Sequence, residues 1–370
     1  MAEESKYNGY YFKLKDTIKV LFLGLFCGQQ TLLDIDCWAK SPQVRDVLLT
    51  RFGIWKLPCY SHFTNLVARI KADELNKMFI EIFGELVSSV RLKTIAIDGK
   101  TVCSTANMKG RQSALHIASA YVAELRITIG QLAVEDKKNE ISAVQELIKI
   151  LDVSDAMVVM DALNCQKKTA KLVLEGGGDY LLAVKKNHRA LYDDIAEMID
   201  FKRTDGVERR FSPLEVHSEC EKGHGRIEKR AAYVTHEVEE LEGCKKWTGL
   251  KCIGMVQTNE ETRYYISSRK LTAKELLYYS RNEWSVESMH WQLDVIFGED
   301  TCLVQDDNVQ KTLNILRKTV LNLAKLYKLQ TNSKLPMSRI MKKCSFDPTL
   351  LIETLANMDD WENMSIMLQN

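Results

Sequence analysis

The stretches Thr94-Ile95-Ala96-Ile97-Asp98-Gly99 and Ala156-Met157-Val158-Val159-Met160-Asp161 decide the fold. Each is a short apolar run that ends at an aspartate, which is the pattern of a buried strand. Two more strand patterns, at residues 114–122 and 126–134, and an amphipathic helix pattern at residues 142–151 lie between them. Beyond the second aspartate the patterns alternate as helix, strand and helix, at residues 167–174, 180–184 and 191–199. This order predicts an α/β fold in which a mixed sheet is flanked by helices.

The regions around this core have patterns of their own. Residues 1–90 have helical periodicity and predict a small helical bundle, without a clear helix-turn-helix pattern. Residues from about 205 to 268 predict a β-rich insertion, followed by one long helix from Thr272 to about Phe297. We therefore expect an α/β domain at residues 91–330, which includes the β-rich stretch, and a C-terminal appendage at residues 331–370, whose structure the pattern does not assign.

The composition is that of a folded globular protein. The 370 residues are 45% hydrophobic and 27% charged, with only 5 prolines and 18 glycines, which excludes a disordered or fibrous chain. The segment from Met1 to Lys13 lacks the pattern of a signal peptide, and the apolar run Val20–Cys27 is too short to span a bilayer. We expect a soluble, intracellular protein with no membrane partner.

Local charge keeps a nucleic-acid partner open although the net charge is only +1. Basic residues are concentrated between Cys165 and Arg189 and again between Lys222 and Arg230. Each concentration alone would be read as a solvated surface, but both follow the acidic candidate Asp161 in the sequence.

The ten cysteines are scattered and form no C-x-x-C pair, so we interpret them as small buried side chains in a reducing compartment. The cluster His217-x-x-Cys220-x-x-x-His224 contains zinc-binding residue types. It lacks a partner cysteine at ligand spacing, which disfavours zinc.

Three carboxylates stand out from the pattern. Asp98 and Asp161 each follow an apolar strand, and open sheets bind ligands at the carboxyl ends of their strands. Glu287 lies on the helix after Thr272, in one polar stripe with Glu283, His290 and Asp294, and we expect Trp284, Trp291 and Val295 on the adjacent stripe to pack inward. The alternatives are an Asp-Gly turn at Asp98 and an ordinary solvated helix face at Glu287.

Together, the three carboxylates match a site that holds two divalent metal ions for phosphoryl transfer, with Mg²⁺ or Mn²⁺ as the ions. Carboxylate oxygens are hard ligands that suit these cations, and about three carboxylates are needed to hold a pair of them. The basic segments would bind the phosphates of a nucleic acid.

At these residues the chain resembles the H-repeat-associated, ISAs-type insertion-sequence transposases, and the resemblance covers nearly the whole chain. The first matching segments are Ile97-Asp98-Gly99-Lys100, Lys138-Asn139-Glu140-Ile141, Asp161-Ala162 with Gln166, Lys185 with Asn187, and His224-Gly225-Arg226-Ile227-Glu228. The last is a block with Arg281, Trp284, Glu287, His290-Trp291, Leu293-Asp294-Val295, Phe297 and Glu299-Asp300. Six motifs in the same order are specific, whereas one would be weak evidence.

The resemblance implies an RNase H-like core and a DDE transposase that cuts insertion-sequence ends and joins the 3′-hydroxyl to target DNA. Asp98, Asp161 and Glu287 would be both catalytic residues and metal ligands, with Asp98 bridging the two ions. The DNA-binding residues would be Lys100, Lys185, Asn187, Arg226, Glu228, Arg230 and Arg281. The partner would be double-stranded DNA, as element terminal repeats and as target, bound by at least a dimer in the bacterial cytoplasm at the nucleoid. Residues 1–90 would be an accessory N-terminal domain for DNA binding, and residues 91–330 the catalytic domain.

The chain departs from the family pattern at four positions. Ser288 stands where Asn is usual, Glu283 where His is common, His188 where Gln is usual and Cys103 where Arg is common. These departures leave two alternatives open: a catalytically silent, transposase-derived DNA-binding protein, and an RNase H-like nuclease without joining activity. The spacing on the last helix does not indicate a hairpin intermediate.

Overall fold

The computed structural model describes residues 5–7, 10–88, 90, 93–105, 114–134, 139–204, 212–223, 226–239, 241–347 and 350–353. Lys138, His224 and Gly225 of the predicted motifs lie outside these residues. So does the end of the predicted C-terminal appendage, from residue 354 onward.

The N-terminal region is helical, as its periodicity predicts. Its helices are α1 (Leu14–Phe26), α2 (Leu32–Lys40), α3 (Pro42–Phe52), α4 (Tyr60–Ala68) and α5 (Ala72–Ser88). They are preceded by a small hairpin of β1 (Ser5–Tyr7) and β2 (Tyr10–Phe12), which the pattern does not predict. Thr31 and Asp34 form a reciprocal capping box at the start of α2, and Pro42 occupies the first turn of α3, where its missing N–H costs little.

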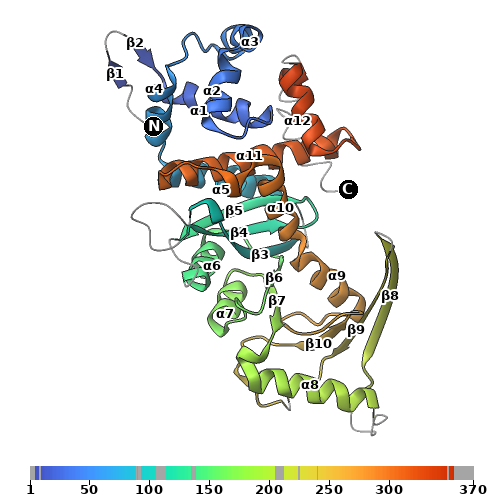
Figure 1. Cartoon of the computed structure of the whole chain (residues 1–370). Helices are drawn as coiled ribbons and strands as arrows, with labels where there is room; N and C mark the ends of the chain where they lie inside the picture. The colour runs from blue at the N-terminus through green and yellow to red at the C-terminus, as the bar shows by residue number, and fades with distance from the viewer. Residues whose placement is uncertain are drawn as a thin grey trace.

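A mixed sheet of nine strands crosses the molecule (Figure 1). Its strand order is β5-β4-β3-β6-β7-β11-β10-β9-β8. The first five are β3 (Thr94–Thr101), β4 (His116–Val122), β5 (Ile127–Val134), β6 (Met157–Met160) and β7 (Asp179–Val184). β3, β6 and β7 are parallel, whereas β4 runs antiparallel to both β3 and β5. This is the RNase H-like arrangement, and the predicted fold class is confirmed.

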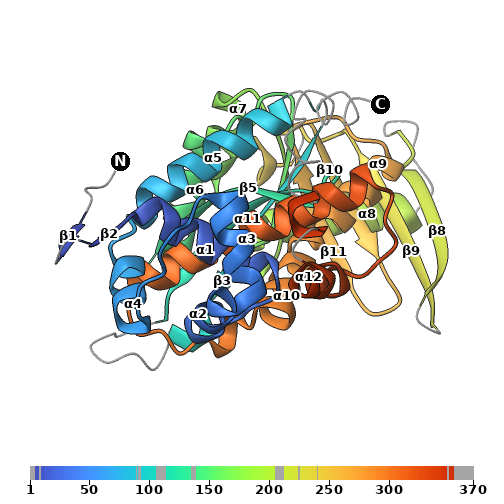
Figure 2. The ribbon, with the colours of Figure 1, turned by 90° about the horizontal axis from the view of Figure 1, so that it is seen from above.

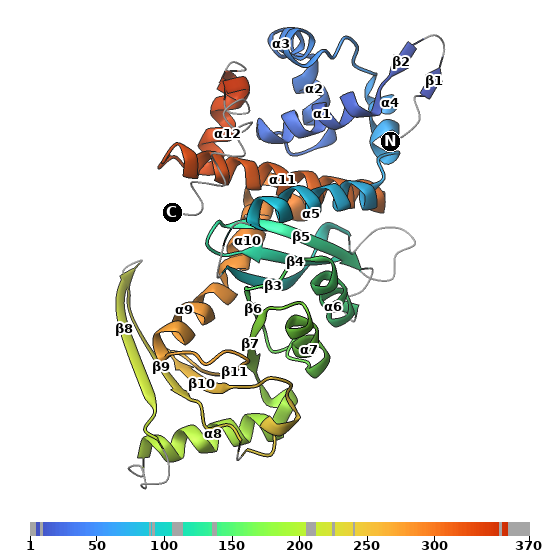
Figure 3. The same cartoon turned by 180° about the vertical axis from the view of Figure 1, so that it is seen from behind.

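Helices cover both faces of the sheet (Figures 1 and 3). On one face the core contains α5 and the helices α6 (Glu140–Ile150), α7 (Lys167–Glu175) and α8 (Arg189–Thr204). On the other face lie α9 (Ala273–Glu283), α10 (Ser285–Phe297) and much of α11 (Asp307–Gln330). Ile95 and Ile97 belong to the first core and Ala96 to the second, so β3 alternates between faces as a strand must.

The predicted β-rich insertion forms four strands, but they are no separate sheet. The strands are β8 (Glu215–Gly223), β9 (Arg226–Thr235), β10 (Cys252–Gln257) and β11 (Thr262–Ser267). β11 pairs antiparallel with β7, with Tyr264 opposite Val184, so the insertion extends the catalytic sheet without a break.

The prediction of one continuous helix from Thr272 to Phe297 is wrong, because the structure has two helices there. Thr272 caps α9 through a capping box with Glu275, as predicted, but α9 ends at Glu283 and α10 begins at Ser285. The amide of Glu287 bonds the carbonyl of Trp284 at 3.1 Å, a turn tighter than an α-helical one.

The break sets which face of α10 is buried. Val286, Met289, Leu293 and Phe297 point into the core, and each is at most 1% exposed. Trp284, Trp291 and Val295, which were expected to pack inward, are 46%, 61% and 56% exposed. The buried stripe that starts at Val286 has the same helical spacing as the exposed stripe that starts at Trp284. The turn at Trp284 directs the buried stripe toward the sheet.

The C-terminal region joins the N-terminal helices in one core. α12 (Met337–Phe346) packs against α1 and α11, and its Met341 and Cys344 are each 1% exposed. Figure 2 shows α11 running beneath the N-terminal helices, with α12 beside them. The start of the predicted appendage is therefore part of the folded core.

All ten cysteines are free, but Cys37, Cys59, Cys103 and Cys220 are exposed, so the expectation that the cysteines are buried is wrong for these four. His217 contacts Glu219 at 3.1 Å. Within the described ranges, no helix has the length and apolarity to cross a membrane.

Close packing of α9 on the insertion gives a stability test. A Cβ on Gly254 of β10 would lie 2.4 Å from Leu276 Cδ2 and 3.1 Å from the carbonyl oxygen of Tyr233. We expect Gly254→Val to lower the free energy of unfolding by about 1–3 kcal/mol in urea denaturation, because α9 must move outward.

Gly84 on α5 is the matched control, since a Cβ there meets nothing within 4 Å. Gly84→Ala should leave the stability unchanged or raise it by up to about 1 kcal/mol, because alanine favours the helix. Equal stability of Gly254→Val and wild type would contradict the packing described here.

Candidate active site

Asp98 and Asp161 lie side by side on neighbouring parallel strands. The register of β3 and β6 pairs Ile97 with Met160, and an aspartate follows each of these residues. Asp161 comes directly after β6, as predicted. The expectation that the first strand ends at Asp98 is wrong, because β3 continues to Thr101 through its pairing with β4.

Gly99 is required by packing and not by a turn. An added Cβ would lie 2.3 Å from His116 Nε2 and 2.7 Å from Glu140 Cδ. These two side chains are buried on the α6 side of β3, with His116 Nε2 2.7 Å from Glu140 Oε2. Glycine is therefore needed at position 99 because the side chains of His116 and Glu140 lie against the backbone of β3. The turn alternative for Asp98 is ruled out.

The carboxylates of the site repel one another. Burial raises the pKa of Asp98 to about 6, against a hydrogen bond from the Gly99 amide that lowers it. The nearby carboxylates of Asp161, Glu140 and Glu287 raise the pKa further. Asp98 thus has an excess of negative charge around it, which a bound cation would relieve.

His290 does not neutralise Asp98. Its Nδ1 lies 3.8 Å from Asp98 Oδ2. Burial, followed by the charges of Lys318 and Lys100, lowers the pKa of His290 to about 3, so the imidazole is neutral at ordinary pH. The contact is therefore between a carboxylate and a neutral ring.

The junction of α9 and α10 brings two glutamates to the same side of the sheet. Glu287 lies exposed in the first turn of α10, and its charge acts on Asp98. Glu283 ends α9 with its side chain only 10% exposed. The Tyr265 hydroxyl donates a hydrogen bond to Glu283 Oε2 at 3.2 Å, and Arg263 Nη1 lies 4.0 Å from Oε1.

Glu283 shares the electrostatics of the aspartates. Burial raises its pKa to about 8, Arg263 opposes the rise, and Asp161 and Asp98 add to it. At neutral pH this carboxyl carries a proton. The sequence showed Glu283 in the polar stripe of Glu287 and as a departure from the family pattern, but not as a candidate site residue, although its position one helical turn before Glu287 is a signal that it faces the same site.

These residues fit a divalent cation by their chemistry. They offer carboxylate oxygens, which Mg²⁺ and Mn²⁺ prefer, at a place where negative charge is uncompensated. Within the part of the chain that the structure describes, no three His, Cys, Asp or Glu side chains are close enough to ligate one ion together. The two aspartates are adjacent, and Glu287 stands farther off.

Lys100, a predicted DNA contact, is engaged within the protein. Its Nζ donates to Asp294 and to Glu299, which is 2.9 Å away, and lies 3.6 Å from Asp300. Glu299 is 1% exposed and also accepts a hydrogen bond from the Asn314 amide at 2.6 Å. The cluster ties β3 to the end of α10.

Lys185 and Asn187 lie beside Asp161. Lys185 is exposed and lines a cavity of about 310 Å³ together with Asp161, Arg263 and Glu283. The Asn187 amide donates to the carbonyl of Ala162 at 2.9 Å. The structure therefore brings these two predicted DNA contacts to the edge of the acidic site.

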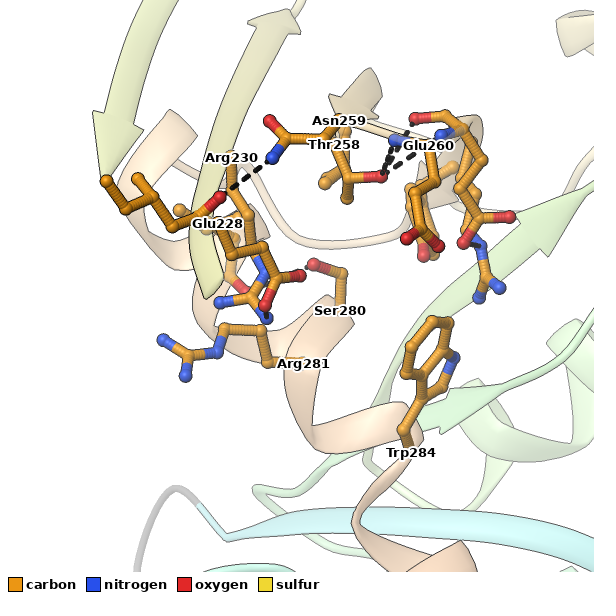
Figure 4. Close-up of a pocket in the computed structure, with 14 residues that line it drawn as sticks. Glu228, Arg230, Thr258, Asn259, Glu260, Ser280, Arg281 and Trp284 are labelled. Carbon is orange, nitrogen blue, oxygen red and sulfur yellow. Dashed lines mark hydrogen bonds and ion pairs between the residues drawn. The ribbon is translucent and has the colours of Figure 1, made fainter. Parts of the chain in front are cut away.

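A second cavity, of about 400 Å³, lies between α9 and the insertion (Figure 4). Arg281 and Trp284 reach it from the end of α9, Glu228 and Arg230 from β9, and Asn259 from the turn before β11. Three more predicted DNA contacts are thus brought together. Arg226 is the last residue of this prediction, and its side chain lies outside the described part.

The arginines of this cavity are paired with glutamates. Arg281 Nη1 and Nη2 each lie 2.9 Å from an oxygen of Glu221 on β8. Arg230 contacts Glu221 at 3.1 Å and Glu228 at 2.6 Å. The arginine charges therefore join β8 and β9 to α9.

Residues 91–323 match the transposase DDE domain family. The chain belongs to this family. It is 32% identical to "Putative protein YbfL" of Escherichia coli over 363 residues, 93% of this chain and 92% of that protein. It is 30% identical to the "H repeat-associated putative transposase YhhI" of the same organism over 363 residues, with the same coverage. Among solved structures, the piggyBac transposase synaptic complex with hairpin DNA is similar with a TM-score of 0.44 and 12% identity, covering 99% of this chain and 78% of that chain.

The predicted insertion-sequence transposase family is therefore confirmed. Two of the positions at which the chain departs from the family pattern, His188 and Ser288, have identifiable partners in the structure. His188 Nε2 bonds the carbonyl of Cys165 at 2.6 Å and packs edge-on against Trp247. The Ser288 hydroxyl donates to the carbonyl of Ser285 at 2.7 Å. Both departures have local partners in this transposase.

The pKa of Asp98 predicts how stability depends on pH. In the folded chain it is about 6, above the ordinary value of 3.8, so the ionised form is disfavoured by folding. The resulting loss of stability is absent below pH 3.8, grows between 3.8 and about 6, and is complete above that range. Asp98→Asn should therefore be more stable than wild type by on the order of 1 kcal/mol at about pH 7.5 with chelator, a value reduced because the side chain is 31% exposed.

Urea unfolding at about pH 7.5 and pH 4 measures this effect. Asp155→Asn is the control, because Asp155 is exposed and its left-handed backbone, with φ +54°, tolerates asparagine. A stability gain for Asp98→Asn that is equally large at both pH values would rule out this cause.

Proposed function

We propose that this transposase cuts DNA at the ends of an insertion sequence and joins the released 3′-hydroxyl to target DNA. The observation that carries the proposal is that the register of the parallel strands β3 and β6 places Asp98 and Asp161 next to each other. Membership of the transposase DDE domain family supports it. Glu287 approaches from α10 on the same side of the sheet.

Asp98, Asp161 and Glu287 would hold two Mg²⁺ or Mn²⁺ ions, with Asp98 between them. When bound, such ions supply activation of the attacking oxygen and stabilisation of the leaving oxygen during in-line displacement. Glu287 would have to move toward the aspartates. Because α9 and α10 meet at the single residue Trp284, a backbone change there would move the first turn of α10 without unfolding either helix.

The other residues of the site would position DNA. Lys185 and Asn187 would contact the strand next to Asp161, and Glu228, Arg230 and Arg281 would contact it along the insertion, together with Arg226. Glu283 carries a proton at neutral pH, so it would not repel the phosphates. We assign Lys100 to the support of β3, because three carboxylates surround its ammonium group.

The partner would be double-stranded DNA that contains the terminal repeats of the element, followed by target DNA. Joining both ends to one target requires two active sites, so we propose at least a dimer on DNA.

Removing either aspartate tests the catalytic assignment. We expect Asp98→Asn and Asp161→Asn to abolish Mg²⁺-dependent nicking of a duplex that carries the element end, while DNA binding remains. Nicking is measured by mapping 3′ ends on gels, and binding by electrophoretic mobility. Asp155→Asn is again the control and should nick as wild type does.

Each other outcome favours a different function. Nicking by Asp98→Asn at the wild-type rate refutes the assignment of that residue. Wild-type binding without any cleavage indicates a silent DNA-binding protein. Cleavage without strand-transfer products indicates a nuclease that does not join DNA.

Lys185 provides a separate test of the DNA contact. A lysine that neutralises one phosphate contributes about one unit to the slope of log affinity against log salt concentration. We expect Lys185→Ala to weaken binding to all sequences alike and to lower that slope by about 1. Lys149→Ala is the control, because Lys149 lies exposed on α6 outside both basic segments, 2.6 Å from Glu146. Identical slopes for both variants would refute the contact.

A further inference from the structure

A chain of buried polar side chains leads to Asp161 from behind the sheet. It begins at Thr101, whose hydroxyl lies 3.0 Å from His116 Nδ1. His116 Nε2 lies 2.7 Å from Glu140 Oε2. The side-chain amide of Asn164 donates to Glu140 Oε1 at 3.0 Å and to Asp161 Oδ1 at 3.2 Å.

Most of the side chains in this row of polar groups are deeply buried. His116 is 1% exposed, Glu140 is 3% exposed and Asn164 is 0% exposed. Burying a carboxylate and an amide costs free energy unless hydrogen bonds compensate for the lost water. Because Gly99 has no side chain, there is room beside it for His116 and Glu140. Apolar residues would have filled this space at lower cost.

The chemistry of Asn164 suits its place between two carboxylates. Its Nδ2 carries two hydrogens, and the structure directs one to Glu140 and one to Asp161. The backbone amide of Asn164 also donates to Asp161 Oδ1, at 3.1 Å. Two donors from one residue thus hold the same oxygen of Asp161, and neither of them reaches Oδ2.

We propose that Asn164, oriented by Glu140 and His116, is a positioning residue that fixes the rotamer of Asp161 and so decides which oxygen it presents to a divalent cation. The inference rests on the proposed function, because it takes Asp161 as a ligand. Hydrogen bonds that orient ligating carboxylates contribute strongly to metal affinity in proteins. Asn164 touches neither substrate nor cation in this role.

Direct binding of Mn²⁺ to the full chain tests the inference independently of DNA cleavage. Unbound Mn²⁺ is counted by its electron paramagnetic resonance signal. We expect Asn164→Ala to weaken Mn²⁺ binding by about tenfold, and Glu140→Ala by a similar factor. Glu140→Gln keeps an oxygen that accepts from Asn164, so it should stay within about threefold of wild type. This rescue would not follow from a merely structural role.

Gln145 is the matched control. It lies on α6 as Glu140 does, is 7% exposed, and donates a buried hydrogen bond to Thr169 at 3.2 Å, outside the chain that leads to Asp161. Gln145→Ala should lower the thermal midpoint about as much as Asn164→Ala does and leave Mn²⁺ affinity unchanged. Circular dichroism confirms that each variant is folded, and if Asn164→Ala is not, the two Glu140 variants decide.

The outcomes separate the inference from the function on which it rests. If wild type binds Mn²⁺ and Asp161→Asn does not, but Asn164→Ala binds as wild type does, the positioning role is overturned and the metal site stands. An equal loss in Gln145→Ala and Asn164→Ala also overturns it. If wild type binds no Mn²⁺ with or without DNA, the proposed metal site and the positioning role fall together.

Discussion

The parallel pairing of β3 with β6 is the constraint on which the candidate site depends. Its register places Asp98 beside Asp161, although 63 residues, from 98 to 161, separate them in the chain. Two carboxylates so placed repel each other, and partial burial weakens the screening by water. The backbone ladder and the cores on both faces hold them there regardless. Burial, and then the repulsion from Asp161 and the other carboxylates, raises the pKa of Asp98.

Two lysines close to the site, Lys100 and Lys318, do not relieve this repulsion. Lys100 is bound to Asp294 and Glu299. Lys318 lies buried on α11, donates to Ser119 and Gln131, and has its pKa lowered to about 7 by burial. The charge of Lys100 is thus bound to other carboxylates, and that of Lys318 is reduced by desolvation. This balance agrees with the proposal that the site binds divalent cations.

Much of the fold could be predicted because apolar runs are buried in the core of a folded protein. The strands around Asp98 and Asp161 follow from such runs. The extension of β3 could not be predicted, because Lys100 and Thr101 are polar and extend the strand only through pairing with β4. Nor could the break at Trp284, which no proline or glycine marks. The role of Asn164 depends on Glu140, which is 24 residues away in the chain, and only folding brings the two together.

The continuity of the nine-stranded sheet has a mechanical consequence. Because β11 is hydrogen-bonded to β7, and β7 to β6, the hairpin of β8 and β9 is attached to the strand of Asp161 by an uninterrupted ladder. A hairpin attached by a flexible linker could rotate relative to the site. A hairpin that is part of the sheet cannot, because a sheet resists shear between its strands and deforms mainly by twisting. The hairpin is therefore held in fixed alignment with Asp98 and Asp161, and the stiffness of the sheet keeps the distance between them constant.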